Sequence, residues 1–230
     1  MNRYIPAFAA LLISAACAVP ASDIPEAVQH EMTASETGGS HQTVKPIGFD
    51  CDGGGQVEEL VCSDNELAKM DRELVRLTDL VRNDEGAASE KRKELGRSKS
   101  DFYRDIEECW KAIAFRQCVI TGYAAVIARV RSGNAISRMR DAEGISRGPF
   151  AFRCDGFGAL IGATFVTTDP GVVFLEWADS EIALSKTPTG SGSKYASRWE
   201  NDDWVFRERG EEASFETSFG NFQCKREEIG

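Results

Sequence analysis

Histidine is scarce in this 230-residue sequence, which contains only His30 and His41. Both lie in a polar stretch, 22–50, that has no sustained hydrophobic period. The rest of the chain therefore cannot form the Ser–His or Cys–His pairs of nucleophilic enzymes, nor a histidine-based metal site. The glycine-rich run 156–162 has one residue too many for a dinucleotide fingerprint. From these absences we expect no enzymatic activity, no metal and no cofactor.

Long apolar runs are also missing, because no stretch of the chain approaches the roughly 18 residues of a membrane-spanning helix. The longest apolar stretch, 5–16, follows Arg3 and precedes small residues, a pattern typical of a secretory signal peptide over 1–21. We therefore expect an exported protein. Two outcomes stay open at Cys17: removal with the signal peptide, or acylation as a lipid anchor, the only membrane contact that we expect. Removal is favoured, because Ser14 stands where lipoprotein sites usually carry Leu.

Positive charge is in deficit, with 27 Lys and Arg against 37 Asp and Glu and a net charge of −10. Nucleic acid needs a basic surface, so we expect no nucleic-acid partner. Residues 22–50 carry five acids against one lysine and predict a flexible acidic linker. Residues 150–230 carry 14 acids and 8 bases, a net charge of −6 that suits a cationic protein partner. Three of these acids gather at one turn, which could suggest a glycosidase pair but is more typical of a solvated face: Glu208, Glu211 and Glu212.

Cysteine is the exception to this scarcity, with seven in the chain. One is Cys17, and the other six fall into three groups along the sequence. An even number of cysteines in an exported chain predicts a disulfide framework. We expect neighbours along the chain to pair: Cys51 with Cys62, Cys109 with Cys118, and Cys154 with Cys224.

Residues 51–132 have the hydrophobic period of helices. Ser63, followed by Glu66, predicts a capping box at a helix start. A second helical stretch is expected over 89–110, and a third after Cys118. The apolar stripe of the first helix is Leu67, Met70, Leu74, Leu77 and Val81. The pattern predicts a disulfide-stapled helical hairpin, followed by a Ser-, Gly- and Arg-rich linker over 133–149.

From residue 150 the hydrophobic period falls to two, as in strands. Short strands alternate with turn residues, and eight of them are expected before the chain ends. Eight strands in about 80 residues predict a small closed antiparallel barrel. A bridge between Cys154 and Cys224 would join its first strand to its last. The fold class that we expect is therefore α + β with two domains, 51–132 and 150–230.

Two loops of this second half gather residues suited to binding. The Thr-, Pro-, Gly- and Ser-rich run 187–193 predicts an exposed loop that contains Ser191. Arg209 and Gly210 predict a tight turn between two later strands. Ser191 and Arg209 would then both lie at loop tips, where binding residues are common.

The pattern Ser191-Gly192-x-x-Tyr195, an aromatic strand, Arg209-Gly210 and then Ala-x-Phe resembles the membrane-bound and periplasmic inhibitors of c-type lysozyme, MliC and PliC. The resemblance implies an eight-stranded barrel of a Gram-negative periplasmic or outer-membrane lipoprotein. It also implies that Ser191, Gly192, Tyr195, Arg209 and Gly210 bind c-type lysozyme. Ser191 and Arg209 would be inserted against its two catalytic carboxylates. The sequence departs from the family in having Arg209 for the usual Lys and Arg207 for the usual Trp.

The helical half resembles a second group of lysozyme-inhibitor domains, the LprI type, over about 51–131. The likeness rests on the Cys51 and Cys62 region, on the Cys109 and Cys118 pair, and on Tyr123 after it. It implies a helical module and assigns no binding residue. Two other functions stay open: an envelope protein that binds a small ligand or peptidoglycan, and a structural envelope protein whose helical half is the functional part.

Overall fold

The structure, a computed structural model, describes residues 44–139, 141, 143–199 and 202–228. The expected signal peptide, most of the expected acidic linker, and Cys17 lie outside these residues and stay predictions. Within the described part of the chain, no helix combines the length and the apolar character needed to cross a membrane.

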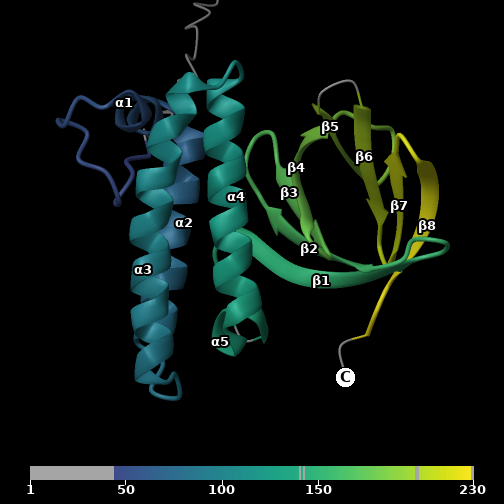
Figure 1. Cartoon of the computed structure of the whole chain (residues 1–230), viewed down its shortest axis with the longest axis horizontal. Coiled ribbons are helices and arrows are strands. Elements are labelled where there is room, and N and C mark those ends of the chain that lie inside the picture. The colour runs from purple at the N-terminus through teal and green to yellow at the C-terminus, as the bar shows by residue number, and fades with distance from the viewer. Residues whose placement is uncertain (1–43, 140, 142, 200–201, 229–230) are drawn as a thin grey trace, which may run out of the picture. The chain divides into compact units, whose positions relative to one another are not determined.

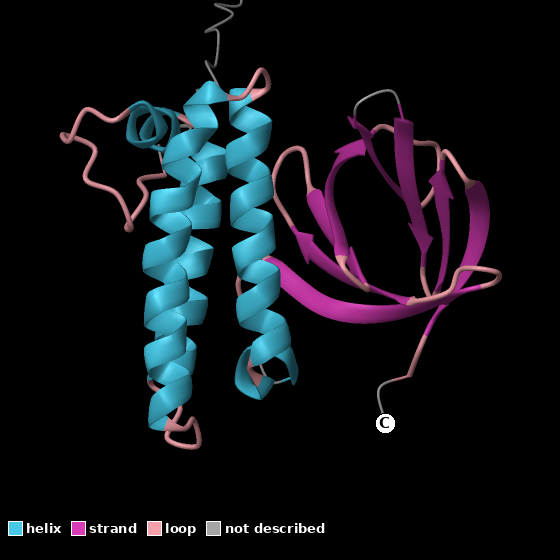
Figure 2. Ribbon diagram, in the orientation of Figure 1, coloured by secondary structure: helices cyan, strands magenta, loops and turns pink. Residues whose placement is uncertain are grey.

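The first half of the described chain is helical, as the hydrophobic period predicts (Figures 1 and 2). Its elements are α1 (Gln56–Ser63), α2 (Asn65–Arg82), α3 (Ser89–Ile106), the 3-10 helix η1 (Glu107–Lys111), α4 (Phe115–Gly133) and α5 (Ala135–Met139). The predicted stripe of α2 is completely buried, with Leu67, Leu74 and Leu77 at the centre of the helical core.

The capping box expected at Ser63 is wrong. Ser63 is the last residue of α1, and its hydroxyl donates a hydrogen bond to the carbonyl of Glu59 at 2.7 Å. Asp64 instead caps the start of α2, because its Oδ1 accepts from the backbone amides of Glu66 at 2.9 Å and Leu67 at 3.1 Å. Its carboxylate, in an extended residue, accepts from two of the free amides of the first turn.

The second half is a closed barrel in which every strand pairs with its neighbours in sequence and β1 pairs with β8. The strands are β1 (Ser146–Cys154), β2 (Leu160–Val166), β3 (Val172–Trp177), β4 (Ser180–Thr187), β5 (Ser193–Trp199), β6 (Asp202–Arg209), β7 (Glu212–Thr217) and β8 (Gly220–Arg226). The predicted fold class, helices followed by an eight-stranded antiparallel barrel, is confirmed. The strand β1 begins at Ser146, four residues earlier than expected.

All three predicted disulfides are present: Cys51–Cys62, Cys109–Cys118 and Cys154–Cys224. Cys154 and Cys224 are directly opposite each other in the pairing of β1 with β8. The third bridge therefore joins the first strand to the last, as the sequence predicts.

Residues 42–230 form one compact unit, in which α4 packs on the barrel. Val172 and Phe174 of β3 and Ala183 of β4 belong to the same hydrophobic cluster as the helices. The inward residues of the barrel form a separate cluster around Phe206 and Phe215. Whether the two halves also fold separately stays a prediction.

The segment expected as a linker, 133–149, contains α5 and the start of β1, and it is held by buried polar contacts. Arg131 is 1% exposed, and its Nε donates to the carbonyl of Gly148 at 2.8 Å. Its Nη1 donates to Asp141 Oδ2 and to the hydroxyl of Ser146, each at 3.1 Å. The carboxylate of Glu73 in α2 accepts from the backbone amide of Ser146 at 3.2 Å. Helix and barrel residues therefore share one buried network.

Candidate functional site

The two loops singled out in the sequence lie at the same end of the barrel. The first, 188–192, connects β4 to β5, and the second, 210–211, connects β6 to β7. Because β5 and β6 are antiparallel neighbours, the start of β5 lies beside the end of β6, and Ser193 is paired with Glu208. Ser191 and Arg209 line one hollow of about 220 Å³. The structure therefore brings together the two residues that were predicted to bind.

Ser191 is exposed at the tip of its loop. Its carbonyl accepts a hydrogen bond from the hydroxyl of Thr189 at 3.3 Å, which closes the loop on itself. Its own hydroxyl has no hydrogen-bond partner among the described residues. A hydroxyl can donate as well as accept, so Ser191 presents both functions to a partner.

Gly192 determines the shape of this loop. Its φ is +67°, in the left-handed region that favours glycine. A Cβ at this position would also lie 2.7 Å from the carbonyl oxygen of Glu208. The loop therefore approaches the β6 backbone more closely than a residue with a side chain would allow.

Tyr195 lies in the barrel interior and is 7% exposed. Its ring is 5.7 Å from that of Phe165, and it is paired with Phe206 across β5 and β6. Burial raises the pKa of the Tyr195 phenol, a hydrogen bond with Ser193 lowers it, and the charge of Glu208 raises it further. In this position Tyr195 supports the base of the Ser191 loop from inside the barrel.

Arg209 is the last residue of β6, and its side chain is exposed. It forms no ion pair with the part of the chain that the structure describes. Gly210 follows with φ +68°, and a Cβ there would meet no atom within 4 Å. Glycine is therefore required at this turn by the backbone conformation and not by a close neighbour. The turn leaves the side chain of Arg209 exposed.

Two further cations lie beside Arg209. Lys194 and Arg207 are paired across β5 and β6, on the outer face of the barrel, and both line the same hollow. Arg207 Nε donates to Glu216 Oε1 at 2.9 Å, so one of these charges is compensated. Sequence reasoning did not give either residue a role. The outward position of Lys194 and Arg207 could have been predicted from strand alternation. Tyr195 and Phe206 point inward, so the residues next to them in each strand must point outward.

The comparison with known families agrees with this geometry. The family model described as membrane-bound lysozyme-inhibitor of c-type lysozyme, MliC, matches residues 152–221. No curated protein and no solved structure matches the chain. The matched range begins in β1 and ends in β8, so it includes both loops of the hollow. The helical region that the LprI resemblance implies is present ahead of it. From residue 152 to residue 221, the barrel is therefore similar to the membrane-bound inhibitors of c-type lysozyme.

Proposed function

We propose that this chain inhibits c-type lysozyme by placing the Ser191 loop and the Arg209 turn in the active-site cleft. The observation that carries the proposal is the shared hollow. There the Arg209 guanidinium and the Ser191 hydroxyl, which have no partner in the part of the chain that the structure describes, lie at adjacent connections. Both connections fall inside the range that matches the inhibitor family.

The chemistry of the cleft explains why these two groups would block it. Lysozyme cleaves its substrate with two carboxyl groups that flank the scissile bond. A guanidinium can donate two parallel hydrogen bonds to one carboxylate, and such charge-assisted pairs are the stronger ones. The hydroxyl of Ser191 can donate to, or accept from, the second carboxyl group. Substrate is then excluded because its binding position is occupied.

The charge of the barrel favours the encounter. Residues 150–230 have a net charge of −6, and a cationic lysozyme is attracted to such a surface over several ångströms. The hollow is lined by three cations, Lys194, Arg207 and Arg209, and by two acids, Glu208 and Glu212. Arg207 is paired with Glu216, so Lys194 and Arg209 are the cations that would face the acidic cleft. Complementary charge of this kind raises the association rate more than it slows dissociation.

The export signal suggests where the inhibitor acts. The predicted signal peptide over 1–21 and the predicted linker over 22–50 would deliver the folded part to the periplasm of a Gram-negative bacterium. If Cys17 is acylated, the same linker would connect the inhibitor to a membrane. Mass spectrometry of the mature protein distinguishes an acylated Cys17 from a chain cleaved after it.

The test is an inhibition assay with the full chain and Arg209→Glu. The variant places a carboxylate against the carboxylates of the cleft, and we expect inhibition to weaken by about a thousandfold. Arg104→Glu is the control, because Arg104 is an exposed arginine of α3, outside the barrel and its hollow. If both variants inhibit equally well, the proposed site is wrong. If neither the native chain nor the control inhibits, the proposed function is wrong.

A further inference from the structure

The barrel wall has an opening between β4 and β5. These strands are paired at Ser185 with Ala196, Lys186 with Tyr195, and Thr187 with Lys194, all close to the Ser191 loop. By contrast, β5 pairs with β6 along its whole length, 193–199. In the described part of the chain, β4 and β5 therefore separate as they run away from the Ser191 loop.

A cavity of about 400 Å³ occupies this opening. Small-molecule sites typically have volumes of this order. One wall is α4, which contributes Gln117 and Thr121, and the other walls come from β3, β4, β5 and β6. The cavity is on the side of the barrel away from the Ser191 loop, so the proposed lysozyme site leaves it unexplained.

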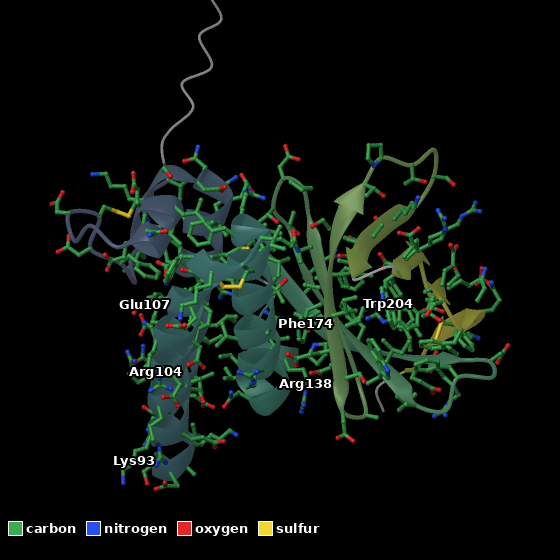
Figure 3. The ribbon with its side chains drawn as sticks, turned by 45° about the horizontal axis from the view of Figure 1, so that its top comes forward. Lys93, Arg104, Glu107, Arg138, Phe174 and Trp204 are labelled. Atoms are coloured by element: carbon green, nitrogen blue, oxygen red, sulfur yellow. A yellow bond between two sulfur atoms is a disulfide. The ribbon has the colours of Figure 1, made fainter. Side chains whose placement is uncertain are left out.

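Two indole rings and the ring of Phe174 are the aromatic part of this cavity among the described residues. Trp177 of β3 and Trp204 of β6 both line it, with ring centroids 5.8 Å apart and ring planes inclined by 32° (Figure 3 labels Trp204). The indole nitrogen of Trp204 is buried and has no hydrogen-bond partner among the described residues. A buried N–H without a partner is destabilising, and a ligand oxygen that reached it after a shift of the surrounding side chains would remove that penalty. The site therefore combines flat apolar surface with a donor that has no partner in the described part of the chain.

The polar groups of the cavity are mostly uncharged. Gln117, Thr121, Ser180 and Ser197 provide amide and hydroxyl groups, and Glu181 is the one charged residue in the lining among the side chains that the structure describes. Glu181 is directly opposite Glu176 in the pairing of β3 with β4. Burial raises the pKa of Glu176 and the charge of Glu181 raises it further, while the charge of Arg129 lowers it. Two neighbouring carboxyl groups disfavour phosphates, nucleotides and other anions.

We propose that this cavity binds an uncharged sugar of one or two pyranose rings. A pyranose has an apolar C–H face that can pack on an indole and a polar edge of hydroxyl groups. Trp177 and Trp204 would contact the face. The indole N–H of Trp204 would donate to a ring substituent, and Ser197, Gln117 and the Glu181 carboxylate would bond the hydroxyls. The cavity volume limits the ligand to one or two rings.

The test uses the indole N–H signals of the full chain in a proton–nitrogen correlation spectrum, titrated with N,N′-diacetylchitobiose or cellobiose. The chain has four tryptophans, so the indole region is simple to assign. We expect saturable shifts of the Trp204 and Trp177 signals at millimolar sugar. The signal of Trp110, in η1 and outside the cavity, should not move.

Two variants locate the binding. Thr121→Trp fills the cavity from α4 and should abolish the sugar-dependent shifts. Trp204→Phe keeps a ring but removes the N–H donor, and should weaken binding about five- to tenfold, as read from the Trp177 signal. Trp110→Phe, the matched control, should bind like the native chain.

The proposal is overturned if neither sugar moves the Trp204 signal, or if Thr121→Trp binds as well as the native chain. It is also overturned if choline shifts the signal and the sugars do not, since that result would show an aromatic site for cations. Arg209→Glu should bind sugar normally, and Thr121→Trp should still inhibit lysozyme. The two sites can therefore fail independently.

Discussion

Gly192 lies against the backbone of Glu208, so that a Cβ added to this glycine would be 2.7 Å from the Glu208 carbonyl oxygen. This contact joins the Ser191 loop to the strand that ends in Arg209. The Ser191 hydroxyl and the Arg209 guanidinium, which are proposed to enter the lysozyme cleft, therefore lie on backbone segments that contact each other. Precise placement of this kind is what an occluding pair requires, because misplacement weakens both contacts.

Gly192→Ala should damage inhibition more than stability. Alanine at φ +67° is strained by about 1–2 kcal/mol, and its methyl group collides with the Glu208 carbonyl. The loop must move away, which displaces Ser191, and we expect inhibition to weaken at least tenfold. Gly190→Ala is the control in the same loop, because a Cβ at Gly190 meets no atom within 4 Å. Equal inhibition by the two variants would show that the loop position does not matter.

Arg209→Lys should retain inhibition with a moderate loss. Lysine restores the residue usual in the MliC resemblance and keeps the positive charge, but it cannot donate two parallel hydrogen bonds to a carboxylate. We expect the inhibition constant to rise by no more than about tenfold, against about a thousandfold for Arg209→Glu. Titration of lysozyme activity with each variant measures the difference. If Arg209→Lys is as weak as Arg209→Glu, the contact depends on guanidinium geometry more than on charge.

Ser191→Ala should have a smaller effect than the charge reversal Arg209→Glu. The substitution removes one neutral hydrogen bond, worth about 0.5–1.5 kcal/mol, and so raises the inhibition constant about two- to twelvefold. Because the hydroxyl has no partner among the described residues, the free energy of unfolding should not change. A loss of stability in urea unfolding would mean that Ser191 has a structural role.

Much of this fold could be predicted from local patterns. A hydrophobic period of two, interrupted by turn residues, predicts eight strands, and six cysteines grouped along the chain predict three bridges. The exposed positions of Ser191 and Arg209 could be predicted because glycine and serine residues interrupt the strand pattern beside them. That the two loops lie at the same end of the barrel could also be predicted, because consecutive antiparallel strands bring alternate connections to the same end.

Contacts between distant residues could not be predicted in this way. Arg131 reads as one of many charged positions on a helix, yet it is buried against Gly148 and Asp141. Its partners lie in the segment expected as a linker, and no local pattern reveals them. The separation of β4 from β5 could not be predicted from the local sequence either, because the pairing of strands depends on the whole barrel. The aromatic cavity beside α4 was missed for that reason.

The Asp141 carboxylate should make stability fall in acid. Its Oδ2 accepts from Arg76 Nη2 at 2.7 Å and from Arg131 Nη1 at 3.1 Å. Burial raises the pKa of Asp141, but the hydrogen bonds and charges of the two arginines lower it more, so its pKa lies below the usual value. Its stabilising effect is therefore complete above about pH 4 and is lost as pH falls through the folded pKa.

Unfolding in urea at a series of pH values from neutral to about 3 measures this effect. We expect Asp141→Asn to be less stable than the native chain at neutral pH, with the difference shrinking in acid. Asp155→Asn, at an exposed turn of the barrel, is the control and should follow the native curve. A difference between Asp141→Asn and the native chain that stays constant over the whole range would contradict the assignment.

The Cys154–Cys224 bridge should contribute more stability than the shorter bridges. It closes a loop of 70 residues, whereas Cys51–Cys62 spans 11. If the bridge acts mainly by restricting the unfolded chain, its removal costs about 4 kcal/mol, and removal of the shorter one costs about 1.5 kcal/mol less. Urea unfolding of the two double alanine variants measures both values.

The bridge also joins β1 to β8, which share three residue pairs, fewer than β1 shares with β2. Its removal should therefore open the barrel at this junction first. Amide hydrogen exchange in the double variant should accelerate at Phe152 and Arg226 before it accelerates at Phe206 in β6. Uniform acceleration over all eight strands would show instead that the barrel opens as one cooperative unit, with the bridge acting only on the unfolded chain.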